Sequence, residues 1–122
     1  MSRDFALHDG NLGNKQVGMF SYDEDHKRFS MSVDSGVPIA DLPLSLEVLV
    51  NKGNYQIGHD ETLHWVRSRL CPPGRQNIKE ILAGIGLTEY DEFKMILATA
   101  GKCDKDELFL VELPLISNQD MI

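Results

Sequence analysis

The sequence predicts an α+β domain, and three patterns along the chain lead to this prediction. Apolar and polar residues alternate over 28–34, which is the period of a strand with one buried face, and Phe5–His8 and Val17–Tyr22 also have strand character. Between 42 and 100, apolar residues instead recur every three or four positions, as they do in helices. The apolar segment Leu108–Val111 again has the composition of a strand. Strands on either side of a helical middle favour α+β over alternating α/β.

The N-terminal strands are expected to form a small antiparallel sheet. Glycine and asparagine at 10–14 supply turn residues after the first strand. The polar segment 23–27 joins the second and third strands into a hairpin with a longer loop. Leu108–Val111 is apolar on both faces, so we expect it to return to this hairpin as a central strand.

The helices are expected at 42–52, 61–70, 75–85 and 89–100. Pro43 is tolerated in the first turn of the first helix, and Asp60 is a suitable N-cap for the second. Pro72 ends the second helix, because it biases the residue before it towards an extended conformation. Gly86 and Gly101 end the third and fourth helices.

The stretch 67–101 is expected to be the unit around which the rest of the chain is organised. A Pro-Pro-Gly break at 72–74 precedes two helices with apolar stripes. In the helix before the break, we expect Leu63, Val66 and Leu70 to face the core.

Composition and charge narrow the class of protein. A chain of 122 residues suits one domain, expected over 1–113, with a flexible C-terminal tail over 114–122. No apolar run approaches the roughly 20 residues that span a bilayer, and the N-terminus lacks the apolar region of a signal peptide. We therefore expect a cytoplasmic protein with free thiols at Cys71 and Cys103. The net charge of −7 argues against general binding to nucleic acid or to anionic membranes, and favours a protein partner.

The strongest candidate for a partner-binding site is a basic corner at the Pro-Pro-Gly break. Arg67, Arg69 and Arg75 could grip a partner's carboxylate or phosphate through forked guanidinium contacts. The alternative is an internal salt bridge, for example to Glu89 or Asp91, with helix-dipole pairing for the other arginines.

Trp65 is the chain's single tryptophan and lies beside the apolar stripe of its helix. Tryptophan is enriched among interface hot spots, so it could anchor a partner. The alternative is that it packs at the edge of the core.

Spacing gives no metal or catalytic site. His59 and His64 are five residues apart and do not share a helical face, and Cys71 and Cys103 belong to no C-x-x-C motif. No arrangement nominates a base for a cysteine nucleophile. The acidic residues at 104, 106 and 107 lack EF-hand spacing and are expected to form a solvated turn. We therefore expect no catalytic residue, no metal and no cofactor.

Several short motifs together resemble the N-terminal subdomain of HipA-like kinases. They are Leu-Cys-Pro-Pro-Gly-Arg at 70–75, Ile-Leu-Ala-Gly-Ile-Gly-Leu at 81–87, Asp-Glu-Phe-Lys-Met-Ile-Leu at 91–97, and Gly-Lys-Cys-Asp-Lys-Asp-Glu-Leu at 101–108. Val17–Asp23 and Leu42–Leu46 are also similar, so the resemblance covers about 17–113. The chain departs from the family at two places: it has Pro-Pro-Gly where the family has Pro-Glu-Gly, and Asp-Glu-Leu where the family has Gly-Ala-Leu.

The resemblance implies a non-catalytic role. HipA-like kinases carry their ATP site and catalytic aspartates in a larger C-terminal core, whereas this sequence has no Gly-rich phosphate loop and no kinase signature. It therefore implies a stand-alone accessory module of a toxin–antitoxin system, which binds or regulates a kinase partner.

Two alternatives remain open. Residues 75–100 have the glycine punctuation of a helix-turn-helix, which would make the protein a DNA-binding regulator. Glu89, Asp91 and Glu92 count against this alternative, because they place negative charge on the expected recognition helix. The other alternative is a small soluble domain, or a small enzyme, of unknown function.

Overall fold

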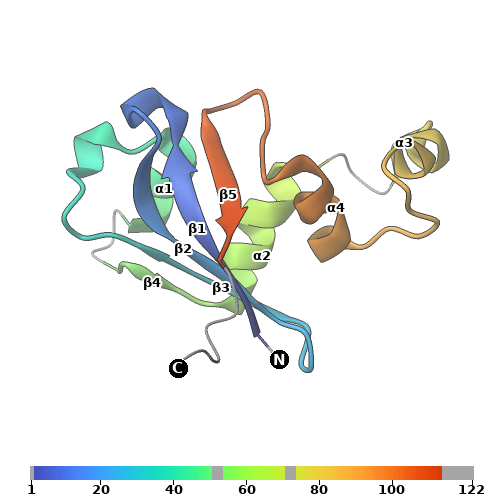
Figure 1. The fold of residues 1–122 in the computed structure, drawn as a ribbon, viewed down its shortest axis with the longest axis horizontal. Coiled ribbons are helices and arrows are strands. Elements are labelled where there is room, and N and C mark those ends of the chain that lie inside the picture. The colour runs from blue at the N-terminus through green and yellow to red at the C-terminus, as the bar shows by residue number, and fades with distance from the viewer. Residues whose placement is uncertain (1, 51–53, 71–73, 114–122) are drawn as a thin grey trace, which may run out of the picture.

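The computed structural model describes residues 2–50, 54–70 and 74–113, and over these residues the chain is an α+β domain (Figure 1). Its five strands are β1 (Ser2–Asp9), β2 (Lys15–Asp23), β3 (Arg28–Val33), β4 (Gln56–Ile57) and β5 (Leu108–Glu112). They form one sheet in the order β4-β3-β2-β1-β5, and every neighbouring pair is antiparallel. The predicted fold class and the predicted 17–34 hairpin are confirmed.

The helices of the described residues are α1 (Leu44–Val50), α2 (His59–Ser68), α3 (Ile78–Gly84) and α4 (Glu92–Thr99), with 3-10 turns at Gly10–Leu12 and Ile39–Asp41. Figure 1 shows α2 close to the sheet with α4 beside it, while α3 stands apart at one end of the molecule. None of these helices combines the length and the apolar character that a bilayer crossing requires.

An aromatic cluster joins the sheet to α2 and α4. Phe20, at the centre of β2, is fully buried and lies opposite Phe5 on one side and Met31 on the other. Its ring centroid is 6.0 Å from that of Trp65 on α2. Phe93 on α4 stacks on Tyr22 with centroids 4.0 Å apart. The period-two alternation of the strands thus places one row of rings against both helices.

Gly18 is required by the close approach of β2 and β3. It lies opposite Val33 in the register, and a Cβ built on it would overlap the carbonyl oxygen of Ser32. On the other side of β2, Gly18 pairs with Leu7 of β1. The register of the β1–β2 pairing shifts immediately after this pair, between Leu7 and His8. Glycine is therefore the residue that lets the two backbones meet at this point.

The prediction that Leu108–Val111 is a strand that returns to the sheet is confirmed, but the central position expected for it is wrong. Among the described residues, β5 pairs with β1 alone and lies at the edge of the sheet. β1 occupies the position beside the hairpin, and the outward N–H of Leu110 donates to the carbonyl oxygen of Ala100 at 2.8 Å. Val111 is accordingly 45% exposed. The strand is apolar although it lies at the edge, because Leu108 and Leu110 are buried and the 100–101 segment packs against Leu110.

Several helix predictions also need correction. Gly58 rather than Asp60 is the N-cap of α2, and Asp60 lies exposed in the first turn. The fully buried residues of α2 are Thr62, Trp65 and Val66. The prediction that Val66 faces the core is confirmed, and Leu63 and Leu70 pack against the core as half-buried side chains. The loop expected at 54–59 contains β4.

The stretch 67–101 does not organise the chain. From this stretch, the main core cluster takes Phe93 and Ile96, while most of its members come from the strands, α1 and α2. Leu82 on α3 is buried but lies outside that cluster. A sheet offers a whole apolar face, whereas α3 offers a single short stripe, so the sheet is the centre of the fold. The Pro-Pro break at 72–73, the end of the first helix expected at 52 and the tail expected at 114–122 lie outside the described residues.

Candidate functional site

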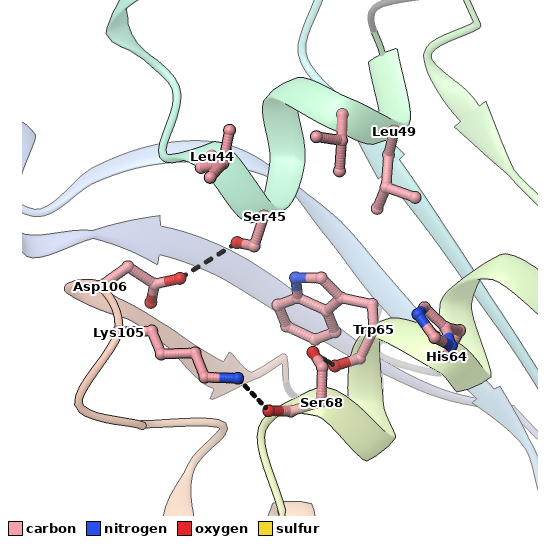
Figure 2. Close-up of a pocket in the computed structure, with 9 residues that line it drawn as sticks. Leu44, Ser45, Leu49, His64, Trp65, Ser68, Lys105 and Asp106 are labelled. Carbon is pink, nitrogen blue, oxygen red and sulfur yellow. Dashed lines mark hydrogen bonds between the residues drawn. The ribbon is translucent and has the colours of Figure 1, made fainter.

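A groove lies between α1 and α2 and is bounded on one side by the loop before β5 (Figure 2). It has a volume of about 490 Å³, which is in the range of ligand pockets. The residues that line it are Leu44, Ser45, Val48 and Leu49 from α1, His64, Trp65 and Ser68 from α2, and Lys105 and Asp106 from the loop. Its walls are mostly apolar, and its polar groups are concentrated on the loop side.

Asp106 holds the three segments of the groove together. Arg69 donates to its two carboxylate oxygens at 2.9 and 2.7 Å, and Ser45 Oγ on α1 donates to it at 3.0 Å. The backbone N–H of Leu108 donates to it as well, at 3.0 Å. Arg69 also donates through Nε to the carbonyl oxygen of Gly101 at 2.6 Å. This network fixes the groove's loop wall against both helices.

The charge of Asp106 is cancelled within the protein. Burial would raise the pKa of its carboxyl group, but hydrogen bonds from Arg69, the Leu108 N–H and Ser45 outweigh that effect and hold the pKa below its ordinary value. Asp106 is therefore an ionised carboxylate at neutral pH, with Arg69 as its counter-ion. The Arg69 guanidinium also lies 4.7 Å from the centre of the Trp65 ring, within the range of a cation–π contact.

Trp65 forms the floor of the groove. The residue is 3% exposed. Its indole Nε1 is buried as well, and it has no hydrogen-bond partner among the described residues. Figure 2 shows the indole nitrogen on the side of the ring that faces Ser45 and α1. An unpaired buried donor costs about 1–3 kcal/mol, so an acceptor that reached it from the groove would be stabilised.

Exposed apolar side chains lie along the outer edge of the groove. Leu44 is 72% exposed and Val48, one helical turn further along α1, is 57% exposed. Ile39, in the turn before α1, is also exposed but does not line the groove. We call Leu44 and Val48 the apolar strip.

The structure does not bring the predicted basic corner together. Arg69 points inward to Asp106 instead of lying on the surface, and its side chain is 2% exposed. Arg67 pairs with Glu92 at 3.0 Å, and Arg75 Nε donates to Asn77 Oδ1 at 3.1 Å. Arg67 and Arg69 therefore form internal salt bridges, as the alternative interpretation expected. Their partners are Glu92 and Asp106 instead of Glu89 or Asp91. Partner binding by the exposed Arg67 and Arg75 stays a prediction.

The structure places the other candidate residues as follows. Trp65 lies in the core rather than at its edge. Asp106 is not part of a solvated turn, because it is the buried partner of Arg69. His59 accepts a hydrogen bond from the backbone N–H of Phe29 at 2.9 Å, which gives it a structural role. Cys103 is a free thiol, and Cys71 lies outside the described residues. Within 2–50, 54–70 and 74–113, no cluster of three or more His, Cys, Asp or Glu residues could hold a metal ion.

Leu44, Val48 and Lys105 line the groove but were not among the site residues expected from the sequence. One signal for the first two was present: the segment Leu42–Val50 carries more apolar residues than one buried face of a helix needs. No local pattern identified Lys105, because its position depends on how the loop before β5 folds against α2.

Comparison of the chain with protein-family models, curated proteins and solved structures gave no match. The candidate site therefore rests on the geometry of this chain alone, and the resemblance to HipA-like kinases stays a prediction.

Proposed function

We propose that the protein is a non-catalytic binding module that docks a partner protein on the apolar strip. The observation that carries this proposal is the exposure of Leu44 and Val48 on the outer side of α1, next to a groove. Single exposed apolar residues are common on monomers, but adjacent ones beside a concave surface are typical of interaction sites. Burying both side chains against a partner would contribute about 1.5–3 kcal/mol each.

The chemistry of the groove supports a binding role over catalysis. Ser45 Oγ is hydrogen-bonded to Asp106, the arrangement of a nucleophile with a neighbouring carboxylate. The pKa of that carboxyl group, however, is lowered by its hydrogen bonds from Arg69 and the Leu108 N–H. A carboxylate with a low pKa is a weak base and cannot activate a hydroxyl group efficiently. Ser45 is better explained as a link between α1 and the loop.

The partner that the sequence suggests is a HipA-like kinase in a toxin–antitoxin context. This part of the proposal rests on the resemblance of 17–113 to the N-terminal subdomain of those kinases, in which the subdomain accompanies a catalytic core. We place the interaction in the cytoplasm, on the basis of the sequence.

Affinity capture with matched variants tests the proposal. Tagged protein is incubated with native lysate and with a purified HipA-like kinase from the same genome, and bound proteins are identified by mass spectrometry. We expect the kinase to bind the native protein and to be lost with Leu44→Glu/Val48→Glu. Val111→Glu changes an exposed apolar residue on β5 instead and is the control, which should retain the partner.

Two results would count against the proposal. Capture that is unaffected by Leu44→Glu/Val48→Glu would remove the apolar strip as the docking surface. If Arg67→Glu/Arg75→Glu abolished capture instead, the binding surface would be the one that the sequence first suggested.

A further inference from the structure

We propose that the α1–α2 groove is a binding site for a small apolar carboxylate, a molecule with a hydrocarbon or aryl chain and one anionic head. This inference goes beyond docking of a protein partner and does not depend on it. It rests on the walls of the groove, the unpaired donor in its floor and the charge on its loop side.

The apolar walls are suited to a hydrocarbon chain. Leu49 on α1 faces the Trp65 ring across the groove (Figure 2), and Leu44 extends the apolar wall toward the loop side. Val48 also lines the groove. The volume of about 490 Å³ exceeds the space that one inserted side chain occupies, and it suits a free ligand. Contact with the Trp65 ring would remove much of the chain's apolar surface from water.

The polar groups select an anionic head. Lys105 Nζ donates to the carbonyl oxygen of Ser68 at 3.1 Å, and within the described residues no carboxylate pairs with it. Among the described residues that line the groove, Asp106 is the single carboxylate, and it is already neutralised by Arg69. The lining residues therefore carry an unbalanced positive charge at Lys105, although the whole protein has a net charge of −7.

Trp65 Nε1 provides a second reason for an acceptor-bearing ligand. It is a buried donor without a partner, and it lies on the side of the ring that faces Ser45 (Figure 2). Because Nε1 is fully buried, the indole must turn toward the groove before a carboxylate oxygen can accept from it, whereas Lys105 is exposed and can pair with the carboxylate directly. A cationic head would meet Lys105, and a purely apolar ligand would leave Nε1 unpaired.

Binding of matched eight-carbon probes tests this inference on the isolated protein. The probes are octanoate and octylammonium, each used below its critical micelle concentration, and 1-octanol, used below its solubility limit in water. The chain has a single tryptophan, so the fluorescence of Trp65 reports on the groove directly. We expect octanoate to bind about tenfold more tightly than 1-octanol, which corresponds to about 1.4 kcal/mol, and octylammonium to bind most weakly. The Trp65 Nε1–H resonance should shift with octanoate in NMR spectra.

Two lysine variants separate the groove from the general charge of the protein. Lys105→Gln should reduce octanoate affinity to that of 1-octanol. Lys102→Gln removes an exposed lysine that does not line the groove and should leave octanoate affinity unchanged. Equal affinity for octanoate and 1-octanol, no binding of octanoate to folded protein, or equal effects of the two variants would each overturn the inference. The result is independent of partner capture, so the two proposals can fail separately.

Discussion

Arg69 and Asp106 form a buried bidentate ion pair between α2 and the loop before β5, with side chains 2% and 7% exposed. The two residues are 37 positions apart in the chain, and their pairing places Lys105 at the edge of the groove. The same pair holds Gly101 and Leu108 through the carbonyl oxygens that Arg69 contacts. A substitution here should therefore affect both stability and the shape of the groove.

Removal of one partner of this ion pair should be strongly destabilising. We expect Arg69→Ala to lower the free energy of unfolding by about 3–5 kcal/mol, because Asp106 is left buried without its counter-ion. The double variant Arg69→Met/Asp106→Leu should lose less than the sum of the losses of Arg69→Met and Asp106→Leu, since neither charge remains. Urea denaturation of the unsubstituted protein, these two single variants and the double variant measures the coupling. If the changes in the free energy of unfolding were strictly additive, the two side chains would have no interaction energy and the expectation would be wrong.

Stability should fall in acid. Hydrogen bonds from Arg69 outweigh burial to lower the pKa of Asp106, and hydrogen bonds from Arg3 lower the pKa of Glu112. As the pH falls below about 4, these carboxylates therefore take up protons in the unfolded chain before they do so in the folded protein. Their contribution to the free energy of unfolding is lost as the pH drops through their folded-state pKa values. Urea denaturation between pH 7 and pH 2 should show this decline.

Asp106→Asn should flatten the acid dependence and lower stability at pH 7. Asp104→Asn changes an exposed carboxylate of the same loop and serves as the control. An unchanged slope with Asp106→Asn would show that Asp106 does not titrate differently in the folded state.

Gly18→Ala should destabilise the sheet. The new methyl group would overlap the Ser32 carbonyl oxygen, which is backbone and cannot turn away. Forced displacement of packed strands typically costs about 1–3 kcal/mol. Gly84→Ala is the matched control, because a Cβ there meets nothing within 4 Å and should be neutral or stabilising by about 0.4–1 kcal/mol. Thermal unfolding of both variants measures the contrast.

The apolar strip should be dispensable for folding. Leu44→Glu and Val48→Glu change exposed positions and should alter the free energy of unfolding by no more than about 0.5 kcal/mol each. Leu46→Ala, at a fully buried position of the same helix, should cost about 2–5 kcal/mol. Chemical denaturation distinguishes these cases. A large loss of stability from Leu44→Glu would mean that loss of partner binding cannot be read as a docking effect.

Local sequence patterns identified most of the elements but misplaced their boundaries and partners. The alternation over 28–34 acts between near neighbours, so strand β3 could be anticipated. The helix expected at 89–100 instead begins at Glu92, because Asp91 caps it. The burial of Trp65 and Arg69 could not be anticipated from the sequence, because strands and loops that are distant in the chain cover these two residues. The edge position of β5 likewise depends on β1 taking the place beside the hairpin.

The sequence by itself determined the α+β class, the β2–β3 hairpin and the existence of each helix, because these follow from apolar periodicity and turn residues within short windows. Only the tertiary structure decided which arginine is buried, which carboxylate neutralises it, and that α1, α2 and the loop before β5 enclose a groove over Trp65. The physical reason is that burial and ion pairing depend on contacts between segments far apart in the chain. A charge pattern shows which side chains could pair, and the packing of the sheet against its helices determines which of them do.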